Sequence, residues 1–274
     1  MSSISDETWL LANLHPAQGS AELGIQIPEL PPGEIQLRFT GREGRVNLQQ
    51  AFDFYKFVLA HFPQERNGKL RLIDFGGGWG RILRLFLREF QADQLVLIDC
   101  LTAAIDCARS LNPPFTVVKN EVMPPLPLEP ACTDACYAFS VFSHLSELAC
   151  SRWLTHLRGL LVPGGRLIIT TRGSVQIGNL RHLRAVASPD DADPTHPIAR
   201  SLPHPDEIEQ RYDAGEFQFY PTGGGRGELT SDFYGEAWIP EQWIARNLDR
   251  LGFSGYEFFT EFLTVDQCVF VLTR

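Results

Sequence analysis

The sequence predicts an α/β fold, in which a mostly parallel sheet carries helices on both faces, for three reasons. Between residues 70 and 171, short apolar segments alternate with segments whose apolar residues recur at helical spacing. A run of glycines follows the first apolar segment, where a strand would turn into a helix. The 274 residues suffice to bury a large core in one domain. Strands that alternate with helices run parallel, because each helix returns the chain to the edge where the next strand begins.

The residues before this alternation are expected to form an arm followed by one helix. Residues 1–47 are rich in proline, glycine and polar residues, and the cluster at 28–33 breaks any regular element. Apolar residues at helical spacing between 48 and 62 predict a helix that packs on the domain, and Pro63 ends it. We therefore expect an arm or lid that leads into a packed helix.

The alternating region contains five expected strands and the helices between them. The strands are short and apolar, whereas each helix has its apolar residues on one face. The expected strands cover 70–75, 94–98, 115–119, 135–141 and 166–171, and the expected helices cover 81–90, 103–111 and 146–161. Only the proline-rich link between the third and fourth strands lacks a helical pattern.

The residues after the fifth strand are expected to form an insertion, a helix and a closing strand. The segment 172–238 is too long for a simple connection, and prolines, aromatic residues and three consecutive glycines at 223–225 fill it. An insertion at the carboxyl ends of parallel strands is expected to hold the substrate. Pro240 suits the first position of a helix and Gly252 its C-cap, and a last strand is expected at 265–273.

Charge and composition argue against several classes of partner. The net charge of −9 disfavours binding to nucleic acid or to an anionic membrane surface, because no concentrated basic patch offsets the repulsion. Arginines recur in two groups, Arg81, Arg84 and Arg88, and Arg181, Arg184 and Arg200. Acidic residues and prolines interrupt both groups, so we interpret them as solvated helix faces.

The sequence also indicates no signal peptide, no membrane span and no metal site. The first twenty residues lack a basic segment with an apolar run, and no stretch reaches the roughly 20 apolar residues that cross a bilayer. We expect a cytoplasmic protein. The six cysteines show no C-x-x-C spacing, which indicates neither a zinc site nor a dithiol, so no metal is expected.

The glycine run at 76–80 is the strongest chemical signal in the chain. Glycines are needed where the backbone turns sharply and approaches a ligand closely. A phosphate loop is excluded because no lysine followed by serine or threonine is present, and a dinucleotide loop would need a third glycine that neither register provides. Asp74 before the run would repel a pyrophosphate but attract the ammonium and sulfonium of S-adenosylmethionine (AdoMet). Asp99 ends the second strand, where a carboxylate can bind both ribose hydroxyls.

Five segments resemble, in order and in spacing, the successive motifs of class I AdoMet-dependent methyltransferases. These segments are 73–81 (IDFGGGWGR), 97–100 (LIDC), 120–127 (NEVMPPLP), 137–145 (YAFSVFSHL) and 161–167 (LVPGGRL). The resemblance covers about 71–171 well and, more loosely, the N-terminal arm and the segment 234–252. These two parts look like those of bacterial methyltransferases that are linked to sugar-modifying enzymes.

The resemblance implies a Rossmann-like, seven-stranded, mostly parallel sheet with helices on both faces and a C-terminal antiparallel strand. It further implies an N-terminal arm and helix at 1–66 that cover the cofactor site. The methyltransferase domain itself would occupy 67–274, with the substrate-side insertion at about 172–238.

The resemblance also implies which residues bind AdoMet. Asp74 and the glycines would hold the methionine portion, Asp99 the ribose, and Asn120 with Glu121 the adenine edge. The segment 139–141 would form the floor below the sulfonium. The expected cofactor-binding residues are Asp74, Phe75, Gly76, Gly78, Gly80, Arg81, Asp99, Cys100, Asn120, Glu121, Phe139 and Ser140. Many members carry an aspartate at the position of Asn120, but the carbonyl of an amide can still accept from the adenine amino group. Gly77 has two interpretations, cofactor contact and relief of crowding.

Methyl transfer is an in-line displacement, so alignment of the acceptor and exclusion of water supply most of the catalysis. A hydroxyl acceptor would also need a base, and His144, which follows the fourth strand, is the expected catalytic residue. The competing interpretation is that His144 caps or packs beneath the next helix. Arg172 has two interpretations as well, a contact for an anionic acceptor and a plain surface charge.

The leading hypothesis is therefore an AdoMet-dependent methyltransferase that acts on an oxygen, or less readily a nitrogen, of a small molecule or glycan. An aminopropyl transferase shares the fold, but it needs acidic residues to hold a polyamine, and the loop at 140–143 has none. A module that binds AdoMet or its product AdoHcy without turnover is the non-enzymatic alternative. A dehydrogenase is disfavoured by the missing glycine and by Asp74. The acceptor and the oligomeric state do not follow from the sequence.

Overall fold

The computed structural model describes residues 4–65, 67–186, 195–222, 227–260 and 267–274. The chain divides into two compact units. One comprises residues 1–139 and 159–168, and the other comprises residues 140–158 and 169–274. The glycines at 223–225, expected within the insertion, lie outside the described residues. The expected division of the chain at residue 66 stays a prediction.

A seven-stranded sheet in the order β3-β2-β1-β4-β5-β9-β8 confirms the predicted fold class. Its strands are β1 Leu70–Phe75, β2 Leu95–Asp99, β3 Thr116–Lys119, β4 Thr133–Ala138, β5 Leu161–Thr171, β8 Gly255–Phe259 and β9 Cys268–Thr273. β1 runs parallel to β2 and to β4, and β2 runs parallel to β3, whereas β8 and β9 are antiparallel. The register aligns Asp74 with Leu97 on one side and with Tyr137 on the other. β8 was not expected from the sequence.

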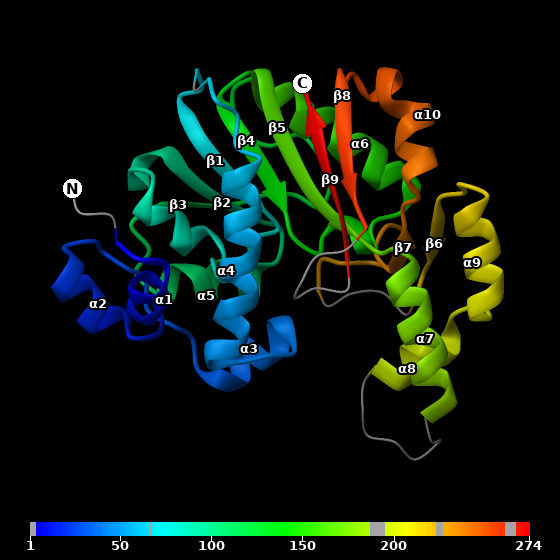
Figure 1. Ribbon diagram of the computed structural model, residues 1–274, viewed down its shortest axis with the longest axis horizontal. Coiled ribbons are helices and arrows are strands. Elements are labelled where there is room, and N and C mark those ends of the chain that lie inside the picture. The colour runs from blue at the N-terminus through cyan, green and yellow to red at the C-terminus, as the bar shows by residue number, and fades with distance from the viewer. Residues whose placement is uncertain (1–3, 66, 187–194, 223–226, 261–266) are drawn as a thin grey trace. The chain divides into compact units, whose positions relative to one another are not determined.

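The first unit begins with four helices, so the expected arm at 1–47 is largely helical, and its role as an arm or lid stays a prediction (Figure 1). The helices are α1 Asp6–Leu14, α2 Pro16–Leu23, α3 Gly33–Thr40 and α4 Gly44–Ala60. Local caps explain them: the Ser5 side chain accepts from the backbone N–H of Thr8, and Gly24 and Gly41 end α2 and α3 in the left-handed conformation. The proline cluster lies between α2 and α3, where it interrupts helical structure as expected.

Three arginines bind these helices to the rest of the first unit, so their interpretation as a solvated helix face is wrong. They are Arg81, Arg84 and Arg88. Arg84 is fully buried, and its guanidinium donates to the Asn13 side chain at 2.9 Å and to the Pro28 carbonyl at 2.5 Å. Burial lowers the pKa of Arg84 to about 9. Arg88 pairs with Asp6 at 2.9 Å. The N-terminal region is therefore bound to the unit through buried charge-assisted hydrogen bonds.

The segment expected as a helix at 81–90 forms only a 3-10 helix, Leu83–Arg88. Its hydrogen bonds span three residues, as from Leu85 N to the carbonyl of Ile82 at 3.0 Å. Five consecutive residues, 83–87, are buried, so no polar face is left for an amphipathic α-helix.

Other helices agree with the expected positions. α5 Thr102–Ser110 and α6 Glu147–Leu160 lie within two residues of their predictions, and α10 Glu241–Leu251 ends at Gly252 in the left-handed conformation. Pro240 is the N-cap of α10 and not its first residue.

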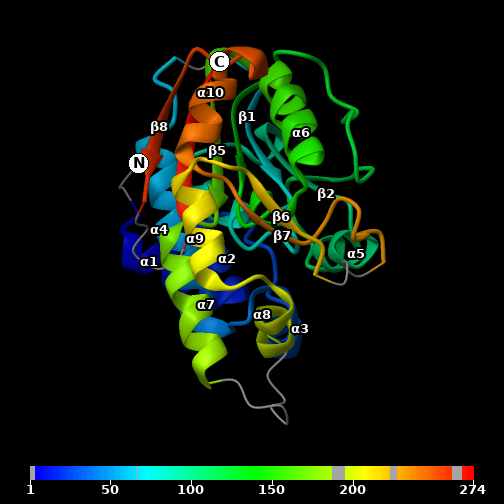
Figure 2. The same cartoon turned by 90° about the vertical axis from the view of Figure 1, so that its right-hand side faces the viewer.

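The described parts of the insertion at 172–238, residues 172–186, 195–222 and 227–238, are folded and belong to the second unit. It contains α7 Ser174–Val186, α8 Thr195–Ser201, α9 Pro205–Asp213 and the hairpin of β6 Gln218–Tyr220 with β7 Glu236–Trp238. Figure 2 shows α7 and α9 side by side. They share a small apolar core with β7, formed by Ile177, Leu180, Ala199, Leu202, Ile208 and Trp238. This core explains how the described parts of a segment without a recognisable motif fold.

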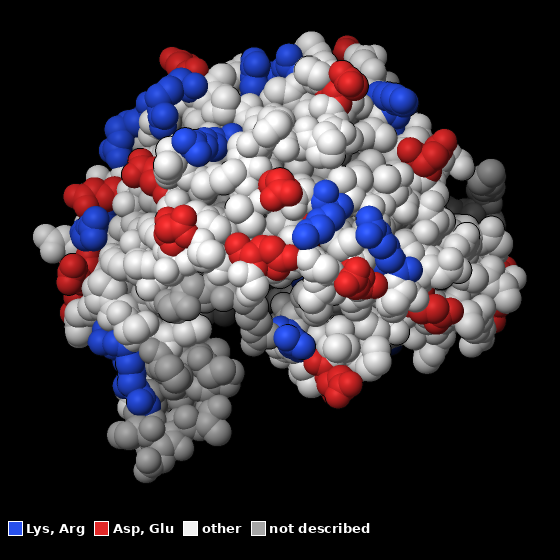
Figure 3. Space-filling model, turned by 180° about the vertical axis from the view of Figure 1, so that it is seen from behind, with Lys and Arg blue, Asp and Glu red and all other residues white. Residues whose placement is uncertain are grey.

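The surface carries both signs of charge, interspersed over the face in Figure 3. Among the described residues, no helix combines the length and the apolar character needed to cross a membrane. The expected cytoplasmic location stays a prediction. Likewise, no group of histidine, cysteine and acidic side chains in the described parts of the chain is arranged to hold a metal ion.

Candidate active site

The glycine run forms a tight turn after β1. Gly76, Gly78 and Gly80 have φ angles of 74°, 58° and 85°, in the region that side chains rarely adopt. Gly77 has a different role, because a Cβ atom there would lie 2.8 Å from the Asp74 carboxyl and from Leu97. The glycine at this position therefore relieves crowding, and its contact with the cofactor stays a prediction. The turn therefore keeps its backbone free of side chains above the end of β1.

Asp74 lies beneath this turn and is 2% exposed. Burial raises the pKa of its carboxyl to about 7, opposed by the Tyr137 hydroxyl and by Arg81 and reinforced by Asp99. Its Oδ2 atom has no hydrogen bond of good geometry to any described residue. A buried carboxylate oxygen without a donor is the arrangement that a cationic ammonium group would complete. Asp74 thus fits the role expected for the methionine portion of AdoMet.

Asp99 and Asn120 lie at the ends of the neighbouring strands β2 and β3. The Asp99 carboxylate accepts from the backbone N–H of Gly78 at 2.9 Å and from that of Leu101 at 2.8 Å. The Asn120 amide donates to the Glu121 carbonyl at 2.5 Å, whereas its own Oδ1 is buried without a partner among the described residues. This oxygen fits an adenine amino donor. Cys100 is half-buried and Glu121 is exposed.

Three more of the expected cofactor-binding residues lie in the first unit, namely Phe75, Arg81 and Phe139. Phe75 and Arg81 are both 5% exposed. The Arg81 guanidinium donates to the Asn47 and Gln50 side chains of α4 at 2.9 and 2.8 Å and lies over the Phe139 ring at 5.2 Å. Burial lowers the pKa of Arg81 to about 10, opposed by the charge of Asp74. The structure thus brings the N-terminal helix α4 against the predicted cofactor residues.

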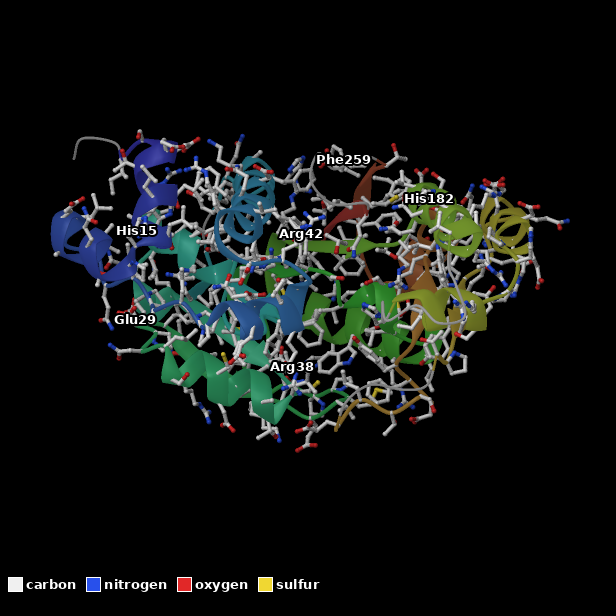
Figure 4. The ribbon with its side chains drawn as sticks, turned by 90° about the horizontal axis from the view of Figure 1, so that it is seen from below. His15, Glu29, Arg38, Arg42, His182 and Phe259 are labelled. Carbon is white, nitrogen blue, oxygen red and sulfur yellow. The ribbon has the colours of Figure 1, made fainter. Side chains whose placement is uncertain are left out.

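The helix α3 also borders the glycine turn, which the sequence did not reveal. The Phe39 ring lies 3.8 Å from the position that a Cβ on Gly78 would take. Arg38 and Arg42 are exposed on and just after α3, in the same unit (Figure 4). Phe39 has no sequence signal, because a single aromatic residue in a proline- and glycine-rich region cannot be assigned to a partner.

In the second unit, Ser140 is held by a closed set of hydrogen bonds. Its φ angle of 58° is unusual for serine. Its backbone N–H donates to the Thr170 hydroxyl at 2.7 Å, that hydroxyl donates to Gln267 at 2.5 Å, and the Gln267 amide donates to the Ser140 hydroxyl at 2.9 Å. The strained backbone of the loop after β4 is therefore fixed by β5 and by the residue before β9.

His144 is bonded to the segment before β7. Its Nδ1 lies 2.8 Å from the Gly235 carbonyl, and its ring stacks on Tyr234 with centroids 5.0 Å apart. Burial and then the positive charge of Arg172 lower the pKa of His144 to about 3. The ring contacts residues 234–236 rather than the start of α6, which does not support a helix cap.

Arg172 is not a plain surface charge, because its side chain is 16% exposed and forms an ion pair with Glu236. Its guanidinium also lies over the Trp238 ring at 5.3 Å. Glu236 was missed at the sequence level, since a single glutamate in a long insertion has no pattern that marks it.

Comparison with known proteins agrees with these observations. The family described as "Methyltransferase domain" matches residues 72–165. Among solved structures, an AdoMet-dependent methyltransferase from Mesorhizobium loti has a TM-score of 0.50 and 16% identity, over 81% of this chain and 98% of that one. An O-methyltransferase family protein from Burkholderia thailandensis has a TM-score of 0.51 and 17% identity, over 84% of this chain and 58% of that one. None of the curated proteins compared with the sequence matches it.

The two structural similarities show the fold, and the family match adds the activity class. AdoMet is the cofactor of this class, and the buried oxygen of Asp74 and that of Asn120 fit it. Residues 72–165 match the family of methyltransferase domains, and the sheet order and the buried oxygens of Asp74 and Asn120 agree with a class I AdoMet-dependent methyltransferase.

Proposed function

We propose that this enzyme methylates an oxygen atom of a small molecule or sugar. When bound, AdoMet supplies an electrophilic methyl group on a positively charged sulfur. The methionine portion would be held by Asp74 and the glycine turn, the ribose by Asp99 and the adenine edge by Asn120. The remaining predicted contacts are Phe75, Arg81, Cys100, Glu121, Phe139 and Ser140. The insertion at 172–238 would bind the acceptor.

The protonation and tautomer of His144 are the observations that support oxygen as the acceptor atom. A carbonyl can only accept, so the 2.8 Å contact with Gly235 places the proton of the neutral ring on Nδ1 and leaves a lone pair on Nε2. With a pKa of about 3, this ring is neutral at physiological pH. A neutral imidazole can take the proton of a hydroxyl group, which becomes strongly acidic as its oxygen bonds to the methyl group.

An amine acceptor would have to lose its proton at a different point in the reaction. Alkyl ammonium groups have a pKa of roughly 10, as lysine does, and must lose a proton before they can attack. An amine that has lost this proton to solvent attacks without a base, whereas a hydroxyl group must give up its proton during the transfer. A neutral imidazole whose Nε2 carries a lone pair therefore supports a hydroxyl acceptor.

A screen of hydroxyl and amine compounds with AdoMet carrying a labelled methyl group tests the proposal. We expect the label on oxygen, and we expect His144→Gln to lower kcat about 100- to 10,000-fold, as loss of general base catalysis does. AdoMet affinity should stay unchanged. The control is His182→Gln, since His182 is exposed on α7 (Figure 4). Label recovered only on nitrogen, or full turnover by His144→Gln, would contradict the proposal.

A further inference from the structure

Three ionisable side chains from distant parts of the sequence meet in the second unit. His144 follows β4 in the chain, Arg172 follows β5, and Glu236 begins β7. One carboxylate oxygen of Glu236 lies 3.5 Å from Nδ1 of His144, and the other forms an ion pair with Arg172. Glu236 therefore lies between a neutral imidazole and a fixed positive charge.

The backbone fixes this arrangement from both sides. Gly235 N donates to the carbonyl of His144 at 2.8 Å, and Ser146 N donates to the carbonyl of Phe233 at 2.8 Å. A side chain on Gly235 would collide with the Tyr220 carbonyl, so this strand can approach its neighbour closely only with glycine there. The position of Glu236 thus follows from strand pairing and not from a flexible surface loop.

Arg172 occupies the second oxygen of Glu236 and is itself held in place. It donates to the Ser143 carbonyl at 3.3 Å and lies over the Trp238 ring. Because Arg172 engages Glu236 on one side, the carboxylate has one oxygen left for the histidine. The charged or titratable side chains that face His144 among the described residues are Glu236, Arg172 and Tyr234.

We propose that Glu236 is a positioning residue that acts through His144 by its charge, and that the Arg172–Glu236 pair sets how readily His144 accepts a proton. The inference rests on the proposed function, in which Nε2 takes the proton of the acceptor hydroxyl. The O–H bond breaks, its proton bonds to Nε2, and its electron pair stays on the oxygen. As this oxygen bonds to the methyl group, the methyl–sulfur bond would break and its electron pair would stay on the sulfur of the departing AdoHcy. The imidazolium formed in this step lies beside the Glu236 carboxylate, whose charge stabilises it.

The Gly235 carbonyl and the Glu236 carboxylate have different effects on Nδ1 of His144. The carbonyl fixes the tautomer, so Glu236→Gln should leave the ring correctly oriented and remove only the charge. We expect that variant to lower kcat by about 10- to 100-fold, which is less than the loss of the base itself. The KM for the acceptor should change little, because Glu236 acts through His144.

The decisive experiment follows the titration of His144 by nitrogen-15 NMR in the full chain without acceptor. In the wild type, His144 should stay neutral, with the proton on Nδ1, down to about pH 4. In Arg172→Gln the unopposed charge of Glu236 should raise the pKa of His144 by about one unit or more, a tenfold or larger change in proton affinity. The double variant Arg172→Gln/Glu236→Gln should lose this rise.

The double variant also guards against misfolding, since it removes both charges together and leaves none buried alone. If the titration of His144 is the same in Arg172→Gln and in the double variant, the charge of Glu236 does not act on His144 and the inference is wrong. If the titration differs as expected but His144→Gln keeps full turnover, the proposed base is wrong while the coupling stands. The two failures are therefore distinguishable.

Discussion

Replacement of Asp74 by asparagine should stabilise the free protein while weakening its binding of AdoMet. The buried carboxyl has its pKa raised from 3.8 to about 7. Between these values the folded state keeps a proton that the unfolded state has lost, so stability falls as pH rises from about 4 to 7 and stays low above 7. The difference corresponds to about 4 kcal/mol at pH 8. Asparagine carries no charge and avoids this cost.

The expected gain can be measured by thermal unfolding. For a chain of this size, 1 kcal/mol corresponds to about 2 to 4 °C in Tm, so Asp74→Asn should melt up to about 8 to 16 °C above the wild type at pH 8. Near pH 4 the two proteins should melt together. Calorimetric titration should show AdoMet affinity reduced about 10- to 100-fold, the loss expected for one hydrogen bond to a charged group.

Asp99→Asn is the matched control. The Asp99 carboxylate already accepts from two backbone N–H groups, at 2.9 and 2.8 Å, so its replacement should lower both Tm and AdoMet affinity. An Asp74→Asn protein that melts below the wild type at pH 8, or that binds AdoMet as tightly, would refute the reasoning about Asp74.

Further predictions concern three other positions. Arg84→Met should cost about 3 kcal/mol in urea unfolding and expose residues 1–30 to protease, since it leaves buried oxygens without a donor; unchanged proteolysis would contradict this. Gly77→Ala should weaken AdoMet binding by displacing Asp74, whereas Gly178→Ala, which has open space, should bind normally and gain about 0.5 to 1 kcal/mol. The pKa of His144, about 3 when folded against 6.5 when unfolded, makes stability fall as pH drops below 6.5. His144→Gln should therefore lose about 2 kcal/mol less than the wild type between pH 8 and pH 5, measured by urea unfolding.

The parallel sheet could be predicted because its signals are local. Buried strands such as β1 and β2 are short, apolar and bounded by turns, and the glycine turn after β1 has few alternative interpretations. The same locality explains the success at α10, where Gly252 marks the C-cap.

The N-terminal region could not be predicted because its order depends on distant partners. Arg84 is buried against Asn13 and Pro28, which lie 71 and 56 residues away in the sequence. An arginine among apolar residues looks like a polar helix face when only spacing is considered. The structure instead buries its charge against carbonyl and amide oxygens, and this tertiary contact overrides the pattern.

The candidate site also contains residues that the sequence could predict and residues that it could not. Asp74, Asp99 and the glycines lie at or just after the ends of strands and could be named from the sequence, whereas Phe39 and Glu236 could not. Glu236 reaches His144 only through the pairing of residues 233–235 with residues 144–146, across some 90 positions of the chain. No spacing rule predicts such a contact.

Calorimetric titration of the purified chain with AdoMet, AdoHcy and NADH, in parallel, tests the central claim most directly. The charge of Asp74 and the missing dinucleotide glycine predict micromolar binding of AdoMet and AdoHcy and no binding of NADH. Asp74→Asn would serve as the matched variant and should weaken AdoMet binding. Binding of NADH with none of AdoMet would contradict the account and indicate a dehydrogenase on this sheet.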